Sequence, residues 1–452
     1  MTPRRFLLLS FFSLGLAGLA AVVLLTGTSG LSWLLCILTI LLGSYPIARG
    51  LIRGQLDIFE PVVMLAAYFT LLMGIRGALV LLEGSVWLSA YQDRSERYNA
   101  LLSWVFAYSM IGLLFLYSGY YSTLGPSIAR RLPRVQFQWR YDRLLLALAI
   151  CLFISLAGSV AYGYLFPAQL AVSGVADIAR NPVLVTETWI TEGGNVIYQV
   201  LLNFSVIGLL LLYVYRVKWG LGIVASATAP LYVIFIVASF LLFGGAKGMI
   251  LLPIAYLLIC RHYVKSAARM KLLIPLGLVV LWLVLPTVGY YRALGPDVEG
   301  LREKVTEGFR HPRVGLDPIL ARSHGADMFF VILAETPDPN PHQWGATYLR
   351  FVTAFIPRAL WPGKPWSFGV EFNRTYLRPA LITSSVAPSL IGEFYINFHL
   401  LGIIVGFFLV GVCCRSLYAY AIERSRQIEL IIFYSIAVTW LTFAMEGPLA
   451  DH

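Results

Sequence analysis

Long apolar runs recur along almost the whole chain, and they restrict its possible folds more than any other feature. A hydrocarbon core about 30 Å thick needs roughly 20 apolar residues of helix to cross it, so runs of about 18 to 24 residues predict transmembrane helices. Such runs lie at 6–26, 31–48, 60–82, 100–119, 144–165, 196–214, 220–243, 249–264, 272–291, 397–415 and 429–446. The sequence therefore predicts an all-α, polytopic membrane protein with about 11 transmembrane helices.

The composition agrees with this class and excludes a water-soluble one. Of the 452 residues, 59% are hydrophobic and 13% are charged, with a mean hydropathy of +0.77. The first run follows Arg4 and Arg5 like a signal peptide, but its length is that of a full span, so we expect it to be retained. All the cysteines fall in apolar runs, which argues against a disulfide framework or a zinc site: Cys36, Cys151, Cys260, Cys413 and Cys414.

Basic residues cluster in the connections between alternate runs. If the N-terminus is cytoplasmic, these clusters all lie on the inner side: Arg49 and Arg53; Arg130, Arg131, Arg134, Arg140 and Arg143; Arg216 and Lys218; Arg261, Lys265, Arg269 and Lys271; Arg415, Arg424 and Arg426. Much of the net charge of +11 is then explained by orientation and by contact with anionic membrane lipids. No nucleic-acid partner is implied.

The same topology places a long connection, residues 292–386, on the outer side of the membrane. Within it, 301–310 has amphipathic helical spacing, and 346–356 is typical of an aromatic-rich helix lying in the membrane interface. Prolines divide the remainder into turns. The chain is therefore expected to form one integral membrane domain, 1–452, with a periplasmic loop at 292–386.

Several cations on the outer side are candidates for binding a phosphate group. Those in the loop are spaced among aromatic residues and prolines: Arg322, Arg350, Arg358, Lys364, Arg374 and Arg378. Guanidinium groups bind phosphate in two-pronged fashion, although a surface salt bridge or a lipid headgroup contact is the alternative for each. Arg76 lies inside the third run, where a charge is costly unless it pairs, with Glu83 as a nearby partner, or reaches the interface. Lys247 lies in a glycine-rich reversal, G-G-A-K-G.

Polar residues also gather at Ser389–His399, where the long loop re-enters the membrane. On a helix, Glu393 and Asn397 share one face, and Tyr395 and His399 share another. A half-buried carboxylate at this depth could accept the proton of a hydroxyl group. The structural alternative is that Glu393 caps the helix or pairs with an outer arginine.

The motifs between about 240 and 415 resemble those of the Wzy-type O-antigen and repeat-unit polysaccharide polymerases. They are G-G-A-K-G, R-S-H-G-A-D-M-F-F, G-A-T-Y, I-P-R-A-L-W-P-G-K-P and P-S-L-I-G-E-F-Y-I-N-F-H-L-L-G. The polymerases more commonly carry arginine at the position of Lys247. The first half of the chain is similar only in being a series of helices.

The resemblance implies a GT-C-like, inverting glycosyltransferase in the bacterial inner membrane, with its active site facing the periplasm. The donor would be a growing glycan on undecaprenyl diphosphate and the acceptor a repeat unit on the same carrier, with a chain-length-regulating co-polymerase as a further partner. No cofactor is implied, and the outer loops contain no D-x-D motif for a metal.

The implied site residues fall into three groups. The catalytic base would be Glu393, with Asp327 or His324 as alternatives. The diphosphate would be bound by Lys247, Arg322, Arg358, Arg76 and Lys364. Tyr348, Tyr395 and Asn397 would contact the acceptor or the glycan.

Two other functions are compatible with these features. An O-antigen ligase would use the same lipid-linked donor but pass the glycan to a lipid A core. A transporter of lipid-linked oligosaccharides would catalyse no reaction, and we would expect paired repeats and broken or charged helices near the bilayer midplane.

Overall fold

The computed structural model is helical, and no strand occurs in the part of the chain that it describes. The described residues are 30–83, 95–135, 138, 140–165, 195–220, 222–242, 247–265, 277, 279, 287, 298–310, 324–353, 361, 368–377 and 388–447. At some helix ends, such as 247–250, only the backbone is described. The all-helical class predicted from the apolar runs is confirmed for these residues.

Several helices have the length and composition needed to cross a membrane. In the described ranges there are four: Pro61–Leu82, Ala100–Tyr121, Tyr141–Val160 and Leu390–Ser425. A fifth is obtained if α2 (Gly30–Gly43) and α3 (Tyr45–Arg53), which are bent by 41° at their junction, form one broken span. The predicted run at 6–26 and most of that at 272–291 lie outside the described residues.

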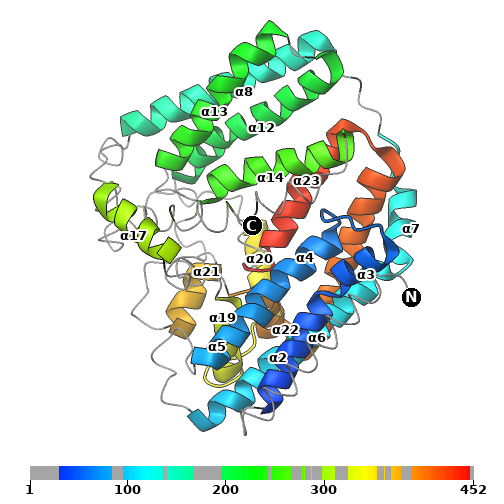
Figure 1. Cartoon of the computed structure of the whole chain (residues 1–452), viewed down its shortest axis with the longest axis vertical. Coiled ribbons are helices and arrows are strands. Elements are labelled where there is room, and N and C mark those ends of the chain that lie inside the picture. The colour runs from blue at the N-terminus through cyan, green and yellow to red at the C-terminus, as the bar shows by residue number, and fades with distance from the viewer. Residues whose placement is uncertain are drawn as a thin grey trace.

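The molecule has two packed groups (Figure 1). The smaller group contains α8 (Tyr141–Leu165), α12 (Asn195–Trp219) and α13 (Ile223–Leu242). The larger group is built around α6 (Ser95–Tyr121) and α22 (Leu390–Tyr418). Between the groups lie α14 (Lys247–Val264) and α23 (Ile428–Phe443), which pack against each other. Four further helices among these, α12, α13, α14 and α23, also coincide with predicted runs.

Five shorter segments also belong to the larger group. The third predicted run forms α4 (Pro61–Phe69), a π-helical segment η2 (Thr70–Ile75) and α5 (Arg76–Glu83) in succession. Next to α6 lies α7 (Leu124–Arg131), and η6 (Ala419–Ser425) continues α22. Because η2 is π-helical, its turn is wider than an α-helical turn and directly precedes Arg76.

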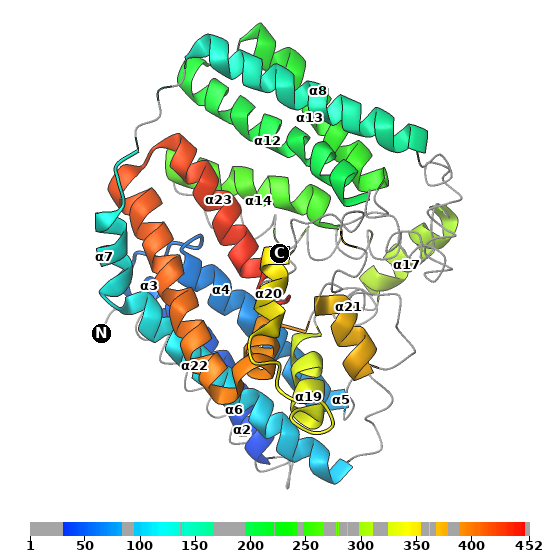
Figure 2. The same cartoon turned by 180° about the vertical axis from the view of Figure 1, so that it is seen from behind.

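The described residues of the long loop form four helices and a π-helical turn. The first, α17 (Val298–Arg310), confirms the amphipathic helix expected at 301–310. It is followed by α19 (Gly325–Glu335), α20 (Ala346–Thr353), α21 (Phe368–Phe372) and η5 (Asn373–Leu377). Ten of the eleven residues of α19 are buried, so this part of the loop packs inside the larger group (Figure 2). We did not expect this from the sequence.

Glycines allow α6 and α22 to approach to backbone contact. A Cβ atom added at Gly411 would lie 2.2 Å from the Leu116 carbonyl oxygen, and one added at Gly119 would lie 2.1 Å from that of Phe408. Small residues at such crossings let membrane helices pack closely, because packing rather than the hydrophobic effect drives their association.

This crossing predicts that Gly411→Val disrupts the larger helix group. The added side chain meets backbone on α6, which cannot move aside as a flexible side chain could, so we expect a loss of about 1 to 3 kcal/mol of stability. The measurement is the thermal denaturation midpoint of the protein in detergent. Leu409→Val, at an exposed position on the same helix, is the control. Equal midpoints for the two variants would contradict the close crossing.

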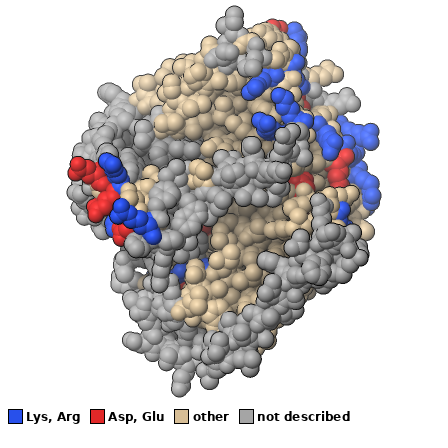
Figure 3. Space-filling view, viewed as in Figure 1, with Lys and Arg blue, Asp and Glu red and all other residues tan. Residues whose placement is uncertain are grey.

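Lys and Arg side chains gather along one side of the face drawn in Figure 3, from the ends of α8 and α12 down to the region of α7. Contacts join the basic connections there: Arg424 donates to the Leu132 carbonyl oxygen at 2.8 Å, and Lys218 pairs with Glu429 at 2.6 Å. The sequence assigned these connections to one side of the membrane, and the structure places them together.

Asp57 joins the connection between α3 and α4 to two other helices at this end. Its Oδ2 accepts hydrogen bonds from the Tyr263 hydroxyl at 2.7 Å and the Tyr418 hydroxyl at 3.1 Å. The Nε2 of His262 lies 3.2 Å from Oδ1. Burial acts to raise the pKa of Asp57, but these hydrogen bonds and the His262 charge outweigh it and lower the pKa. The carboxylate therefore holds α14 and α22 against the connection.

Candidate functional site

Arg76 and Asp327 form a buried ion pair in the larger helix group. Arg76 Nε lies 2.7 Å from Asp327 Oδ2, and Nη2 lies 3.1 Å from Oδ1, so both carboxylate oxygens accept from the guanidinium fork. The side chains are 7% and 0% exposed. Removing two charges from solvent is costly, and here the two-pronged geometry offsets that cost. The sequence pointed to Glu83 as a partner, but its side chain lies outside the described residues.

The ion pair joins two helices, α5 and α19, that are far apart in the sequence. Arg76 begins α5 directly after the π-helical turn, and Asp327 is in the first turn of α19. Gly325 packs against Leu72 closely enough that a Cβ atom there would lie 2.9 Å from the Leu72 Cβ. The close approach of α19 to η2 therefore places the carboxylate beside the guanidinium.

A second polar group is centred on Glu393, which is completely buried near the start of α22. The Thr347 hydroxyl donates to Glu393 Oε1 at 3.0 Å and accepts from Asn397 Nδ2 at 2.7 Å. Asn397 Nδ2 also donates to the Glu393 carbonyl oxygen at 2.8 Å, while its Oδ1 accepts from the Gly345 amide at 2.8 Å. Every polar atom of the Asn397 amide is therefore used, which fixes its orientation and that of Thr347.

The start of α22 is held by its own capping residue and by the residues that follow α23. The Ser389 side chain caps the helix by accepting a hydrogen bond from the Gly392 amide. Ser389 therefore has the capping role that the sequence left open for Glu393. The Ser389 and Leu390 amides donate to the carbonyl oxygens of Glu446 and Met445, at 2.9 and 3.2 Å. The end of the chain after α23 therefore helps to position the Glu393 segment.

The helix α22 is interrupted a turn beyond Glu393. Phe398 and His399 have non-helical backbone angles, with φ of 53° at His399. The segment before the break turns back against the segment after it: a Cβ atom at Gly402 would lie 2.1 Å from the Phe394 carbonyl oxygen. Phe394 also packs on Phe407, with ring centroids 5.5 Å apart. The Glu393 segment is therefore a short folded-back helix.

Tyr395 lies in a cluster of aromatic and histidine rings between the two polar groups. Its ring centroid is 5.9 Å from Phe329 on α19, 5.6 Å from Tyr108 on α6 and 4.8 Å from His399. His342 packs on the same ring at 5.8 Å. Only 5% of Tyr395 is exposed, so the ring lies in the core of this end of the bundle rather than on its surface.

Tyr348 lies closer to the surface than Tyr395. Its ring stacks on Phe398, with centroids 6.4 Å apart, and it is only partly buried. Burial and the nearby Glu393 carboxylate raise the pKa of the Tyr348 hydroxyl, and a hydrogen bond with Asn397 opposes them. Trp344, three-quarters exposed, and Leu349 flank it. Of the residues predicted to contact a glycan, Tyr348 is thus the one beside the surface.

The structure brings some predicted site residues together and leaves others undescribed. Glu393, Asn397 and Tyr348 form one polar group, and Arg76 and Asp327 form another, with Phe329 and Tyr395 packed between their helices. His324 is the residue immediately before α19. For Lys247 the backbone alone is described, as the first residue of α14. Arg322, Arg358 and Lys364 lie outside the described residues.

Thr347 is the polar residue that the sequence did not single out. It lies in the G-A-T-Y segment, which also supplies the Gly345 amide and Tyr348. A single threonine in this segment carries no periodic signal, so it is identified by its hydrogen bond to Glu393, 46 residues further along the chain.

Comparison with known proteins adds one match. The sequence profile of a domain of unknown function, DUF8712, matches residues 318–424, which include α19 to α22 and therefore Asp327, Thr347, Glu393 and Asn397. No curated protein matches the chain, and no solved structure does.

Proposed function

We propose that the protein is a polysaccharide polymerase of the inner membrane that works at the periplasmic face. It would transfer a growing glycan from undecaprenyl diphosphate onto a repeat unit carried by the same lipid. In this proposal the chain has about 11 transmembrane helices in a GT-C-like arrangement, of which the described helices are a part. The motif resemblance and the buried polar groups support it.

The observation that carries the proposal is the buried Glu393 with its fixed polar partners. An ionisable residue inside a helix that can cross a membrane is costly and is usually retained for function. Thr347 and Asn397 hold Glu393 in one orientation, which is what a general base needs. The carboxylate is completely buried, so a sugar hydroxyl can reach it only if part of its surroundings moves.

The proposed reaction is a single displacement with inversion. The acceptor hydroxyl oxygen attacks the anomeric carbon of the donor, and its proton passes to Glu393. The bond from that carbon to the diphosphate oxygen breaks, and the electron pair leaves with undecaprenyl diphosphate. Lys247, Arg322, Arg358 and Lys364 are the cations proposed to offset the developing charge. Arg76 would act from a deeper position, through the ion pair with Asp327.

One structural feature favours a transporter as the second candidate. The interruption of α22 at Phe398 and His399 is a break in a helix that can cross a membrane, and transporters use such breaks to expose backbone groups to substrate. An O-antigen ligase shares the donor chemistry, and no separate observation favours it over the polymerase.

A feeding assay separates the candidates. Purified protein in liposomes is given one lipid-linked repeat unit, and the products are resolved by size. A polymerase should yield a ladder of lipid-linked products. A ligase should yield product only when a lipid A core is added, and a transporter should yield none while moving the repeat unit across the bilayer. The absence of a ladder with active, folded protein would contradict the proposed polymerase.

A further inference from the structure

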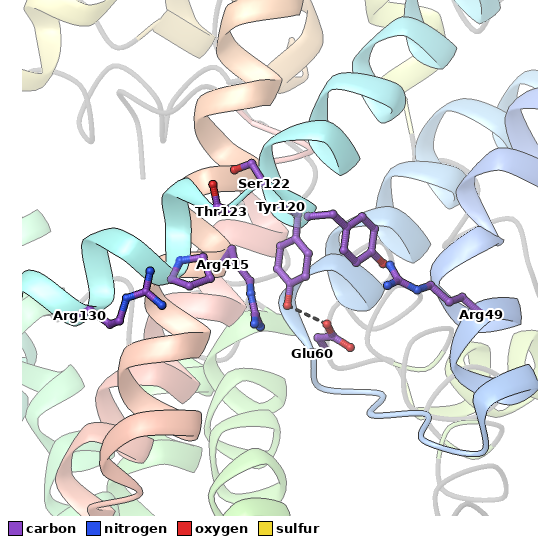
Figure 4. A pocket seen from close by; sticks show the side chains of 9 residues that line it. Arg49, Glu60, Tyr120, Ser122, Thr123, Arg130 and Arg415 are labelled. Atoms are coloured by element: carbon purple, nitrogen blue, oxygen red, sulfur yellow. Dashed lines mark hydrogen bonds between the residues drawn. The ribbon is translucent and has the colours of Figure 1, made fainter.

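A cavity of about 370 Å³ lies at the basic end of the larger helix group, at the opposite end of α22 from Glu393 (Figure 4). Its volume falls within the ~300 to 1,000 Å³ range of small-molecule sites. The polar side chains that line it come from four parts of the chain: Arg49, Glu60, Ser122, Thr123, Arg130 and Arg415. The proposed polymerase reaction uses none of them.

The three arginines approach the cavity from three helices. In Figure 4, Arg49 on α3 and Arg130 on α7 reach in from opposite sides, and Arg415 on α22 lies between them. The Arg49 guanidinium stacks on Tyr121, 3.9 Å from the ring centroid. Arg49 also hydrogen-bonds to the Tyr121 hydroxyl, and the remaining N–H groups at the edge of the guanidinium can donate to a ligand. Arg130 donates to Ser127 Oγ at 3.0 Å and is otherwise exposed.

Positive charge is only partly balanced around this cavity. Arg415 donates to both carboxylate oxygens of Glu423, at 2.9 and 3.2 Å. Among the described residues, Arg49 and Arg130 form no ion pair with a carboxylate. Glu60 is the single acidic residue of the lining and accepts from the Tyr120 hydroxyl at 2.8 Å. Glu423 balances the charge of Arg415. The charges of Arg49 and Arg130 against that of Glu60 therefore leave the lining positive.

Glu60 offsets the positive charge of the arginines less than a solvent-exposed carboxylate would, because burial favours its protonated, neutral form. Burial raises its pKa, and the Tyr120 hydrogen bond and the nearby arginines only partly oppose this. Convergent guanidinium groups with adjacent hydroxyls are the usual partners of a phosphate group. Ser122 and Thr123 supply such hydroxyls at the cavity.

We propose that this cavity binds the phosphate group of an anionic ligand through Arg49, Arg130 and Arg415. Its position favours a phospholipid headgroup as the source. The cavity lies where helices that can cross a membrane end. Tyr121, 40% exposed, lines it, and Tyr45, 44% exposed, packs nearby on Tyr117, as aromatic residues gather at membrane interfaces. A bound phosphate would join α3, α7 and α22 at this end, because each contributes one arginine.

Thermal denaturation of the purified, delipidated full-length protein in a neutral detergent tests this site. Phosphatidylglycerol, phosphatidylcholine and inorganic phosphate are titrated separately, and the rise in the denaturation midpoint gives an apparent Kd. We expect a saturable rise with phosphatidylglycerol and none with phosphatidylcholine at the same concentration. Arg49→Gln and Arg130→Gln should each weaken the apparent affinity roughly tenfold, because each removes a charge-assisted contact.

Matched controls are available on the same helices. Arg53 on α3 and Arg131 on α7 are exposed and do not line the cavity, so Arg53→Gln and Arg131→Gln should bind as the unchanged protein does. A saturable, Arg49-dependent rise with inorganic phosphate would assign the site to a soluble phosphate ligand instead of a lipid. Equal effects of lining and control variants, or no rise with either phosphate source, would overturn the proposal. Polymerase turnover does not enter this test, so its outcome is independent of the proposed function.

Discussion

Asp327→Ala is expected to lower the free energy of unfolding by about 3 to 5 kcal/mol. The substitution leaves the Arg76 guanidinium inside the protein without this carboxylate, and arginine cannot give up its proton to become neutral. Arg76→Ala should cost less, because the remaining carboxyl group can take up a proton. Denaturant titration of the full chain in detergent micelles measures both values.

An exposed ion pair gives the matched control for this prediction. Lys304 and Glu307 on α17 are 2.8 Å apart, with side chains 47% and 38% exposed. Glu307→Ala should therefore change the free energy of unfolding by less than about 1 kcal/mol. The double variant Arg76→Met, Asp327→Leu should recover most of the lost stability, since it leaves no buried charge. A cost for Asp327→Ala no larger than that for Glu307→Ala would show that the pair does not stabilise the fold.

Glu393→Gln is expected to reduce turnover per folded molecule about 100-fold or more, within the range that general bases contribute. The amide is nearly isosteric and still offers an oxygen to the Thr347 hydroxyl, so the fold and donor binding should persist. It cannot accept a proton from the acceptor hydroxyl. Turnover is measured from product ladders and divided by the amount of folded protein in the same liposomes.

A structural role for Glu393 would give the opposite pattern. The amount of folded protein would fall, while the surviving molecules would polymerise at near-normal specific activity. That result would move the proposed base to His324, because both oxygens of Asp327, the other alternative, accept from Arg76. Glu303→Gln, the same change at an exposed position on α17, is the control for effects of the substitution itself.

The described helices were predictable because their signals are local. Apolar runs and the amphipathic spacing at 301–310 are read from neighbouring residues, and α17 and the long apolar helices follow them. The apolar segment of α19 was assigned to an outer loop because it is too short to cross a membrane. Its burial within the larger helix group depends on tertiary packing, which the length criterion does not detect.

The sequence predicted which residues belong to the site better than it predicted which of them contact one another. Glu393 and Asn397 lie on one helical face as predicted, because they precede the break at Phe398. The Arg76 and Asp327 side chains come from positions 251 residues apart, and no periodic pattern links them. From the sequence alone, Arg76→Ala is expected to leave protein levels intact. The observed ion pair instead predicts less folded protein.

Because the start of α22 folds back on its own helix, the Glu393 segment has several of its packing partners within α20 and α22. Its inner side rests on its own helix, at Gly402 and Gly406, and its polar side rests on α20. Most of what defines its geometry is therefore encoded within α20 and α22, inside the stretch 318–424 that the DUF8712 profile matches. The surrounding helices can therefore diverge in sequence while the contacts that position this carboxylate are kept within one short stretch of chain.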